Sequence, residues 1–140
     1  MKPALLDTGP LVALLDRNDP YHEWILPRVH RLQGKLVTTG AIVTEATFFL
    51  QNVNDGISKL FELLADPAVV IRDCFQAPQL RTAAALMARY GDTPMDFADA
   101  TLVLLAEELG TDRILTLDER GFRTYRHGRN LAFAMVLQDA

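Results

Sequence analysis

Four acidic residues stand beside apolar segments of this 140-residue sequence: Asp7, Glu45, Asp99 and Asp118. Asp7 and Asp118 each follow a short apolar run, and Asp99 lies in the first turn of an apolar helical pattern. Carboxylates brought close together repel one another and raise each other's pKa, so a cluster of them is strained until a cation binds. Oxygen ligands favour Mg²⁺ or Mn²⁺, and such sites leave positions for substrate phosphates. The acids therefore indicate metal-assisted chemistry on a phosphate ester.

Structural roles are an alternative explanation for each acid taken alone. Asp7 could cap a helix or form an Asx turn, although Thr8 can supply the cap and leave Asp7 free to project. On a helical wheel of residues 41–51, Glu45 falls among Phe48 and Phe49, where a buried carboxylate is costly unless it reaches solvent from the edge of that arc.

Asp96 and Asp99 have the spacing of a capping box, with Asp96 as the cap. Asp99 borders the apolar face of its helix, so we assign the functional role to Asp99 and keep Asp96 as a further candidate ligand. Asp118 could form a turn. A structural explanation for all four acids together is much weaker than for any one of them.

Several other classes of site and protein are excluded by the composition. The single cysteine, Cys74, allows no internal disulfide and reads as a core thiol in a reducing cytoplasm, and zinc-binding patterns of paired Cys or His are absent. The sequence is 49% hydrophobic and 23% charged, which predicts one globular domain over residues 1–140 and not a disordered chain. No signal peptide or membrane span is expected.

Apolar runs that do not alternate predict buried parallel strands at residues 3–6, 36–38, 69–72 and 113–117, with a fifth at 132–137. Helical periodicity with start and stop signals predicts helices at residues 11–15, 21–32, 41–51, 57–65, 78–89 and 96–109. This alternation indicates a three-layer α/β/α sandwich with a mostly parallel central sheet. Sites in such folds lie at the carboxyl ends of the strands, where the acids are expected.

Four segments, in this order and spacing, make the sequence similar to the PIN-domain nucleases and, among them, to the VapC ribonuclease toxins. They are LLDTGPL at residues 5–11, TEA at 44–46, DFADATL at 96–102 and LTLD at 115–118, within a resemblance that covers about residues 3 to 125. The resemblance implies a PIN fold and Mg²⁺- or Mn²⁺-dependent endonucleolytic cleavage of RNA. It also implies a cognate antitoxin protein that occludes the site, and a homodimer.

Roles for individual residues follow from the same resemblance. Asp7 and Asp99 would be the principal metal ligands, Glu45 would complete the metal shell or orient water, and Asp118 would bind directly or through water. Thr8 and Thr116 would support these carboxylates with their hydroxyl groups.

The formal charge of −4 counts against a generic nucleic-acid binder. However, four arginines fall within one ten-residue segment after Asp118, accompanied by His127, and could hold RNA phosphates while Tyr125 stacks a base. They are Arg120, Arg123, Arg126 and Arg129. A solvated charged face is the alternative.

Three other functions compete with a toxin nuclease. A PIN-like module could bind RNA or a partner without turnover, or a stand-alone nuclease could process RNA. A receiver-like or phosphatase-like domain is disfavoured, because residues 60–140 contain no lysine and Gly9 stands where a second acid would be needed.

Overall fold

The computed structural model describes residues 1–139, which build one five-stranded sheet. Every pair of adjacent strands is parallel, and the strand order is β3-β2-β1-β4-β5. The strands are β1 (Ala4–Leu6), β2 (Leu36–Thr39), β3 (Val69–Arg72), β4 (Arg113–Leu115) and β5 (Ala134–Met135). The three residues of β1 are all buried, as expected for a central parallel strand covered on both faces.

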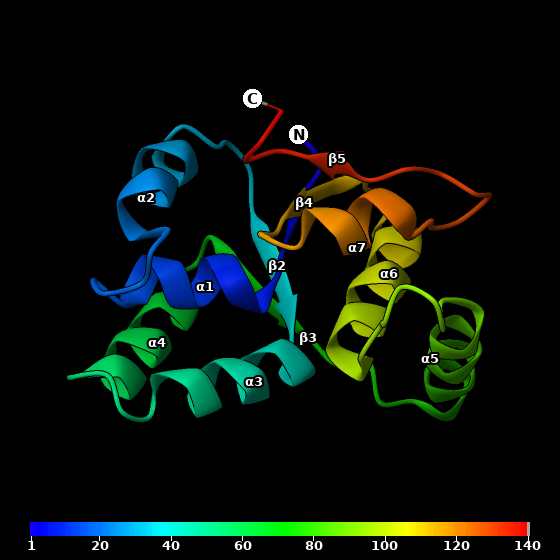
Figure 1. Ribbon diagram of the computed structural model, residues 1–140, viewed down its shortest axis with the longest axis horizontal. Coiled ribbons are helices and arrows are strands. Elements are labelled where there is room, and N and C mark those ends of the chain that lie inside the picture. The colour runs from blue at the N-terminus through cyan, green and yellow to red at the C-terminus, as the bar shows by residue number, and fades with distance from the viewer. Residues whose placement is uncertain (140) are drawn as a thin grey trace.

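Helices cover both faces of this sheet (Figure 1). They are α1 (Thr8–Leu15), α2 (His22–His30), α3 (Gly40–Leu50), α4 (Gly56–Leu64), α5 (Ala77–Arg89), α6 (Phe97–Leu109) and α7 (Glu119–Thr124). In Figure 1, α1, α2 and α4 lie to the left of the strands, α5 and α6 lie to the right, α7 lies just below β4, and α3 runs along the bottom. The predicted α/β/α sandwich with a parallel sheet is therefore confirmed.

Differences from the predicted elements are mostly shifts at the ends. The strand expected at residues 113–117 stops at Leu115, and the one expected at 132–137 is reduced to β5. Helix α7 was not predicted. Its six residues contain Gly121, which weakens the helical signal in the sequence.

Helix α6 positions Asp99, one of the four candidate acids. Eight of its residues are buried, from Ala98 to Ala106, because it lies between the sheet and α5 and contacts both β1 and β2. A helix that is apolar around most of its circumference is expected in such a central layer. The first turn of α6, which carries Asp99, is therefore fixed against the carboxyl ends of the central strands.

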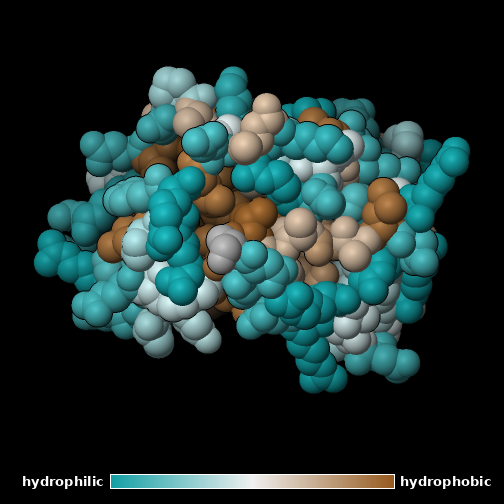
Figure 2. All heavy atoms as spheres, turned by 90° about the horizontal axis from the view of Figure 1, so that it is seen from above, coloured by the Kyte–Doolittle hydropathy of each residue, from teal (hydrophilic) through white to brown (hydrophobic). Residues whose placement is uncertain are grey.

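Figure 2 shows the molecule from above, the side on which β5 lies in Figure 1. Hydrophilic residues surround a central group of hydrophobic ones on this side (Figure 2). Folded proteins commonly expose such apolar atoms, so we assign no function to this group. Within residues 1–139, no helix is both long enough and apolar enough to cross a bilayer.

Candidate active site

Asp7 lies at the junction of β1 and α1 and is only 8% exposed. Its Oδ1 accepts a hydrogen bond from the backbone N–H of Thr8 (2.8 Å), and its Oδ2 accepts one from the hydroxyl of Thr116 (2.7 Å). Asp7 is itself the N-cap of α1, so the expectation that Thr8 caps this helix was wrong. The extended backbone of Asp7 places its carboxylate against the N–H of Thr8, the first residue of α1.

Thr8 instead links two acids, one through its hydroxyl and the other through its backbone N–H. Its Oγ1 donates to Glu45 Oε1 (2.6 Å), while its backbone N–H bonds to Asp7. Glu45 therefore faces the end of β1 from the middle of α3. The prediction that Glu45 sits in a buried apolar arc needs correction, because Phe48 and Phe49 are 66% and 57% exposed and Glu45 is half-buried at the edge of an open aromatic surface.

Asp96 and Asp99 form the capping box that their spacing predicts. Asp96 Oδ1 accepts from the N–H of Asp99 (2.8 Å), and Asp99 Oδ2 accepts from the N–H of Asp96 (3.1 Å). Asp96 is exposed and Asp99 is half-buried. One oxygen of Asp99 thus serves the helix end, while its other oxygen accepts no hydrogen bond within residues 1–139.

Asp118 approaches Asp7 through Thr116. The hydroxyl of Thr116 donates to Asp7 and accepts from the N–H of Asp118 (3.0 Å), and Asp118 Oδ1 accepts from the N–H of Gly121 (3.0 Å). A Cβ atom at Gly121 would collide with the Asp118 carboxylate, so this glycine leaves room for the acid. Asp7 is consequently connected by hydrogen bonds to the carboxylate of Glu45 through Thr8, and to the backbone of Asp118 through Thr116.

Three buried threonines that the sequence analysis did not select brace the same edge of the sheet. Thr38 donates to the carbonyl of Leu6 (2.9 Å), the residue before Asp7. Thr39 is hydrogen-bonded through its hydroxyl to that of Thr101 (2.9 Å), which joins the start of α3 to the first turns of α6. Their only signal in the sequence is a hydroxyl residue inside an otherwise apolar segment.

Burial and mutual repulsion raise the pKa values of three of these acids. Burial raises the pKa of Asp7 to about 6, against the hydrogen bonds from Thr116 and Thr8 and with help from the charges of Glu45 and Asp118. Burial likewise raises the pKa of Asp99, with the charges of Asp7 and Asp96 adding to it. The pKa of Glu45 is raised by burial and by Asp96, and the hydroxyl of Thr8 opposes this.

No lysine, arginine or histidine forms an ion pair with these five acids in the part of the chain that the structure describes. Their donor atoms are all oxygens, which suits a hard divalent cation and not zinc. In residues 1–139, however, no three acidic, histidine or cysteine side chains already converge on one ion position. The chemistry of the donor set fits Mg²⁺ or Mn²⁺.

The arginine segment after Asp118 differs from its prediction. Tyr125 is fully buried and donates to the carbonyl of Pro94 (2.6 Å), so it cannot stack an RNA base, and His127 is 6% exposed. Arg123 is paired with Glu119 (3.2 Å) and Asp139 (3.1 Å). Arg126 Nη1 donates to the three carbonyls of residues 123–125 at the end of α7. Arg120 and Arg129 remain exposed.

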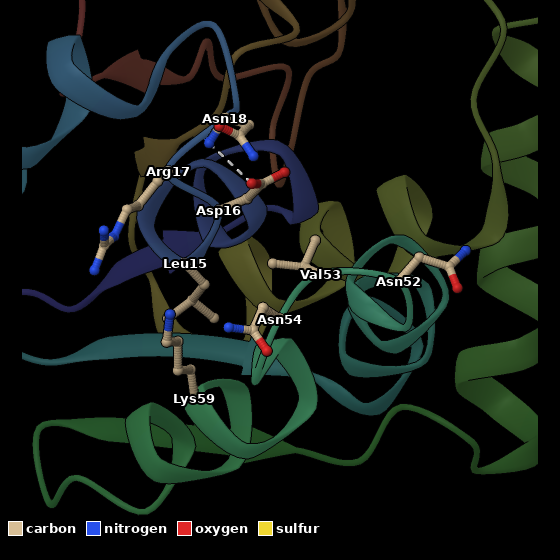
Figure 3. Close-up of a pocket in the computed structure, with 8 residues that line it drawn as sticks. All are labelled: Leu15, Asp16, Arg17, Asn18, Asn52, Val53, Asn54 and Lys59. Atoms are coloured by element: carbon tan, nitrogen blue, oxygen red, sulfur yellow. Dashed lines mark hydrogen bonds between the residues drawn. The ribbon is translucent and has the colours of Figure 1, made fainter.

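Two cavities of about 380 Å³ adjoin the acids, and Glu45 lines both. Phe75 lines one of these cavities and Phe49 lines the other. A third cavity of about 550 Å³ lies at the far ends of α1 and α3 and is lined by none of the five acids. Figure 3 shows its lining residues, among which Arg17 extends away from the others. The cavities next to Glu45 are therefore the ones connected with the acid cluster.

Comparison with known proteins adds a family and a fold. The PIN domain family matches residues 4–128. Ribonuclease VapC26 of Mycobacterium tuberculosis is 30% identical over 125 residues, which are 87% of this chain and 91% of that protein. The solved structure of VapC20 from Mycobacterium tuberculosis, described as a Sarcin-Ricin loop cleaving toxin, has a TM-score of 0.75 at 16% identity, covering 83% of this chain and 90% of that one. The likeness to VapC20 is one of fold.

Proposed function

This chain belongs to the PIN-domain family and, within it, to the VapC-type ribonucleases, and we propose that it is a Mg²⁺-dependent endoribonuclease, with Mn²⁺ as a second usable ion. Ribonucleases of this family generally depend on a divalent metal. The substrate is RNA and the bond cleaved is a phosphodiester. The observation that supports this best is the buried carboxylate of Asp7, linked through two threonines to Glu45 and Asp118 with no cation paired to it among the described residues.

The acids have different proposed roles in metal binding. Asp7 and Asp99 would hold the metal, because burial and the charges around them raise the pKa of both carboxylates and a bound cation would offset this. When bound, the ion activates water and stabilises the leaving oxygen of the phosphate ester. Asp118 contributes directly or through a water molecule, and Asp96 is a further oxygen donor beside Asp99.

Glu45 orients the attacking water. Its Oε1 is held by the hydroxyl of Thr8, and its carboxylate also interacts with that of Asp96. The pKa of Glu45 is raised, which makes its carboxylate a better acceptor for a proton from water. Thr8 and Thr116 are positioning residues, because the hydroxyl of Thr8 holds Glu45 and that of Thr116 holds Asp7.

Cleavage of RNA by the purified protein tests this function. We expect cleavage with Mg²⁺ or Mn²⁺ and none after EDTA, with activity restored when Mg²⁺ is added back, because the acids cannot neutralise the developing charge alone. Cleavage that persists in EDTA would contradict the proposal. Tight RNA binding without cleavage under every metal condition would instead favour a PIN-like binding module.

The biological setting is proposed on the same premise. The protein acts as a cytoplasmic toxin, is neutralised by a cognate antitoxin protein, and forms a homodimer of single-domain chains. Arg120 and Arg129, which are exposed, remain candidates for contacts with RNA phosphates. A short neighbouring gene whose product co-purifies with this protein would support the toxin role, whereas its absence would favour a stand-alone RNA-processing nuclease.

A further inference from the structure

A half-exposed phenylalanine stands over one of the two cavities beside Glu45. Phe75, in the segment between β3 and α5, is 52% exposed and stacks on Phe97 with ring centroids 6.0 Å apart and an interplanar angle of 28°. The same cavity is lined by Glu45 and Asp96. Phe97 thus supports a ring that still offers area to a ligand next to the acids, as a stacking platform requires.

The second cavity has a similar composition on the other side of Glu45. Phe49 and Tyr21, which are 57% and 48% exposed, line it together with Thr8 and Gly9 of α1. Phe49 contacts Phe48 edge-on, with centroids 5.4 Å apart. Both cavities therefore combine an exposed aromatic ring with a direct opening onto the acid cluster.

Glu45 separates the two cavities because of its place on α3. At about 100° per residue, Thr44 and Phe49 fall on opposite sides of Glu45 around the helix, and Thr44 lines the first cavity while Phe49 lines the second. An endonuclease must hold nucleotides on both sides of the bond it cuts. We infer that the bases flanking the scissile phosphate of a single-stranded RNA occupy these two cavities, one stacked on Phe75 and the other on Phe49.

The charges of the cavities favour stacking over phosphate contacts. Neither cavity is lined by a lysine or arginine, and their charged members are the acids Glu45, Asp96 and Asp19. Aromatic stacking holds unpaired bases of any sequence without a basic groove. This explains how a chain with a formal charge of −4 can bind RNA at an acidic site. The inference rests on the proposed ribonuclease function.

Steady-state cleavage of a short single-stranded RNA by variants of Phe75 tests it. We expect Phe75→Ala to raise KM about tenfold with little change in kcat, because the lost stacking acts on substrate and transition state alike. Phe75→Trp should keep KM near that of the native protein, since a larger ring can also stack. Phe49→Ala should raise KM as Phe75→Ala does. Phe48→Ala is the matched control, because Phe48 is 66% exposed and lines neither cavity.

Binding of the same RNA in an Asp99→Asn background, measured by fluorescence anisotropy, separates this inference from the function on which it rests. We expect Phe75→Ala to weaken this binding about tenfold even though no turnover occurs. Unchanged KM and Kd in Phe75→Ala, or an equal loss in Phe48→Ala, would overturn the inference and leave the cavities to the apolar side chains of a protein partner. Absence of cleavage by the native protein would count against the ribonuclease function and not against the stacking sites.

Discussion

Replacing Asp99 by asparagine is expected to lower the rate of RNA cleavage at least about a thousandfold while leaving the fold intact. Asparagine keeps the shape of the side chain and an oxygen that can accept from the N–H of Asp96, so α6 retains its capping interaction. It removes the negative charge that, in the proposed mechanism, binds the metal. The loss should therefore fall on kcat and on metal dependence, measured in single-turnover assays over a range of Mg²⁺ concentrations.

Asp92→Asn is the matched control for this variant. Asp92 is exposed in the segment before α6 and is not among the acids around Asp7. Its replacement by asparagine changes the formal charge of the protein by the same amount as Asp99→Asn. Its activity should equal that of the native protein. An Asp99→Asn variant that cleaves as fast as Asp92→Asn would remove Asp99 from the proposed metal site.

In the metal-free protein, the contribution of Asp7 to the free energy of unfolding is expected to fall as the pH rises through about 6. Burial raises the pKa of Asp7 to about 6 in the folded state, whereas an unfolded aspartate has a pKa of about 3.9. The folded state thus binds the proton more strongly, and the stability gained from it is lost between these two values as the pH rises. The full effect is about 3 kcal/mol, of which about 1.4 kcal/mol separates pH 5 from pH 7.5.

Thermal melts of the native protein and Asp7→Asn in EDTA measure this effect. The single carbonyl oxygen of asparagine can cap α1, and its amide nitrogen can donate to the hydroxyl of Thr116, but asparagine carries no charge at any pH. The melting temperature of Asp7→Asn relative to the native protein should therefore rise by about 3–6 °C between pH 5 and pH 7.5. Adding Mg²⁺ at pH 7.5 should stabilise only the native protein. A pH-independent difference between the two proteins would show that Asp7 titrates normally.

Local signals in the sequence were sufficient for most of the framework. The unbroken apolar runs gave the parallel strands, and the spacing of Asp96 and Asp99 gave a capping box that the structure confirms. Both depend on residues at most a few positions apart, so no knowledge of the tertiary structure was needed.

Features that depend on distant residues were missed or predicted wrongly. Tyr125 is held by the carbonyl of Pro94 and packs against Tyr90 and Phe122, with ring centroids 5.0 and 5.1 Å away. These contacts bury a ring that, in the sequence, stood in a run of arginines. They also help to hold α7, whose glycine hides it from helical periodicity.

The candidate site shows the same division. The four acids were predicted from their positions after strands and in helices, but the hydrogen bonds that Thr8 and Thr116 make to Glu45 and Asp7 were not. The hydroxyl of Thr8 reaches Glu45 across 37 positions, and that of Thr116 reaches Asp7 across 109. The exposure of Phe48 and Phe49 could not be inferred either, because an aromatic arc on a helix has the same pattern whether or not another element covers it.

Direct measurement of Mn²⁺ binding tests the central claim that these carboxylates form one metal site. Free Mn²⁺ can be followed by electron paramagnetic resonance during titration of the native protein, Asp7→Asn, Asp99→Asn and Asp92→Asn. We expect binding by the native protein and Asp92→Asn, and affinity at least about tenfold weaker in Asp7→Asn and Asp99→Asn, because each loses a charged ligand. Equal Mn²⁺ affinity in all four proteins would contradict the account.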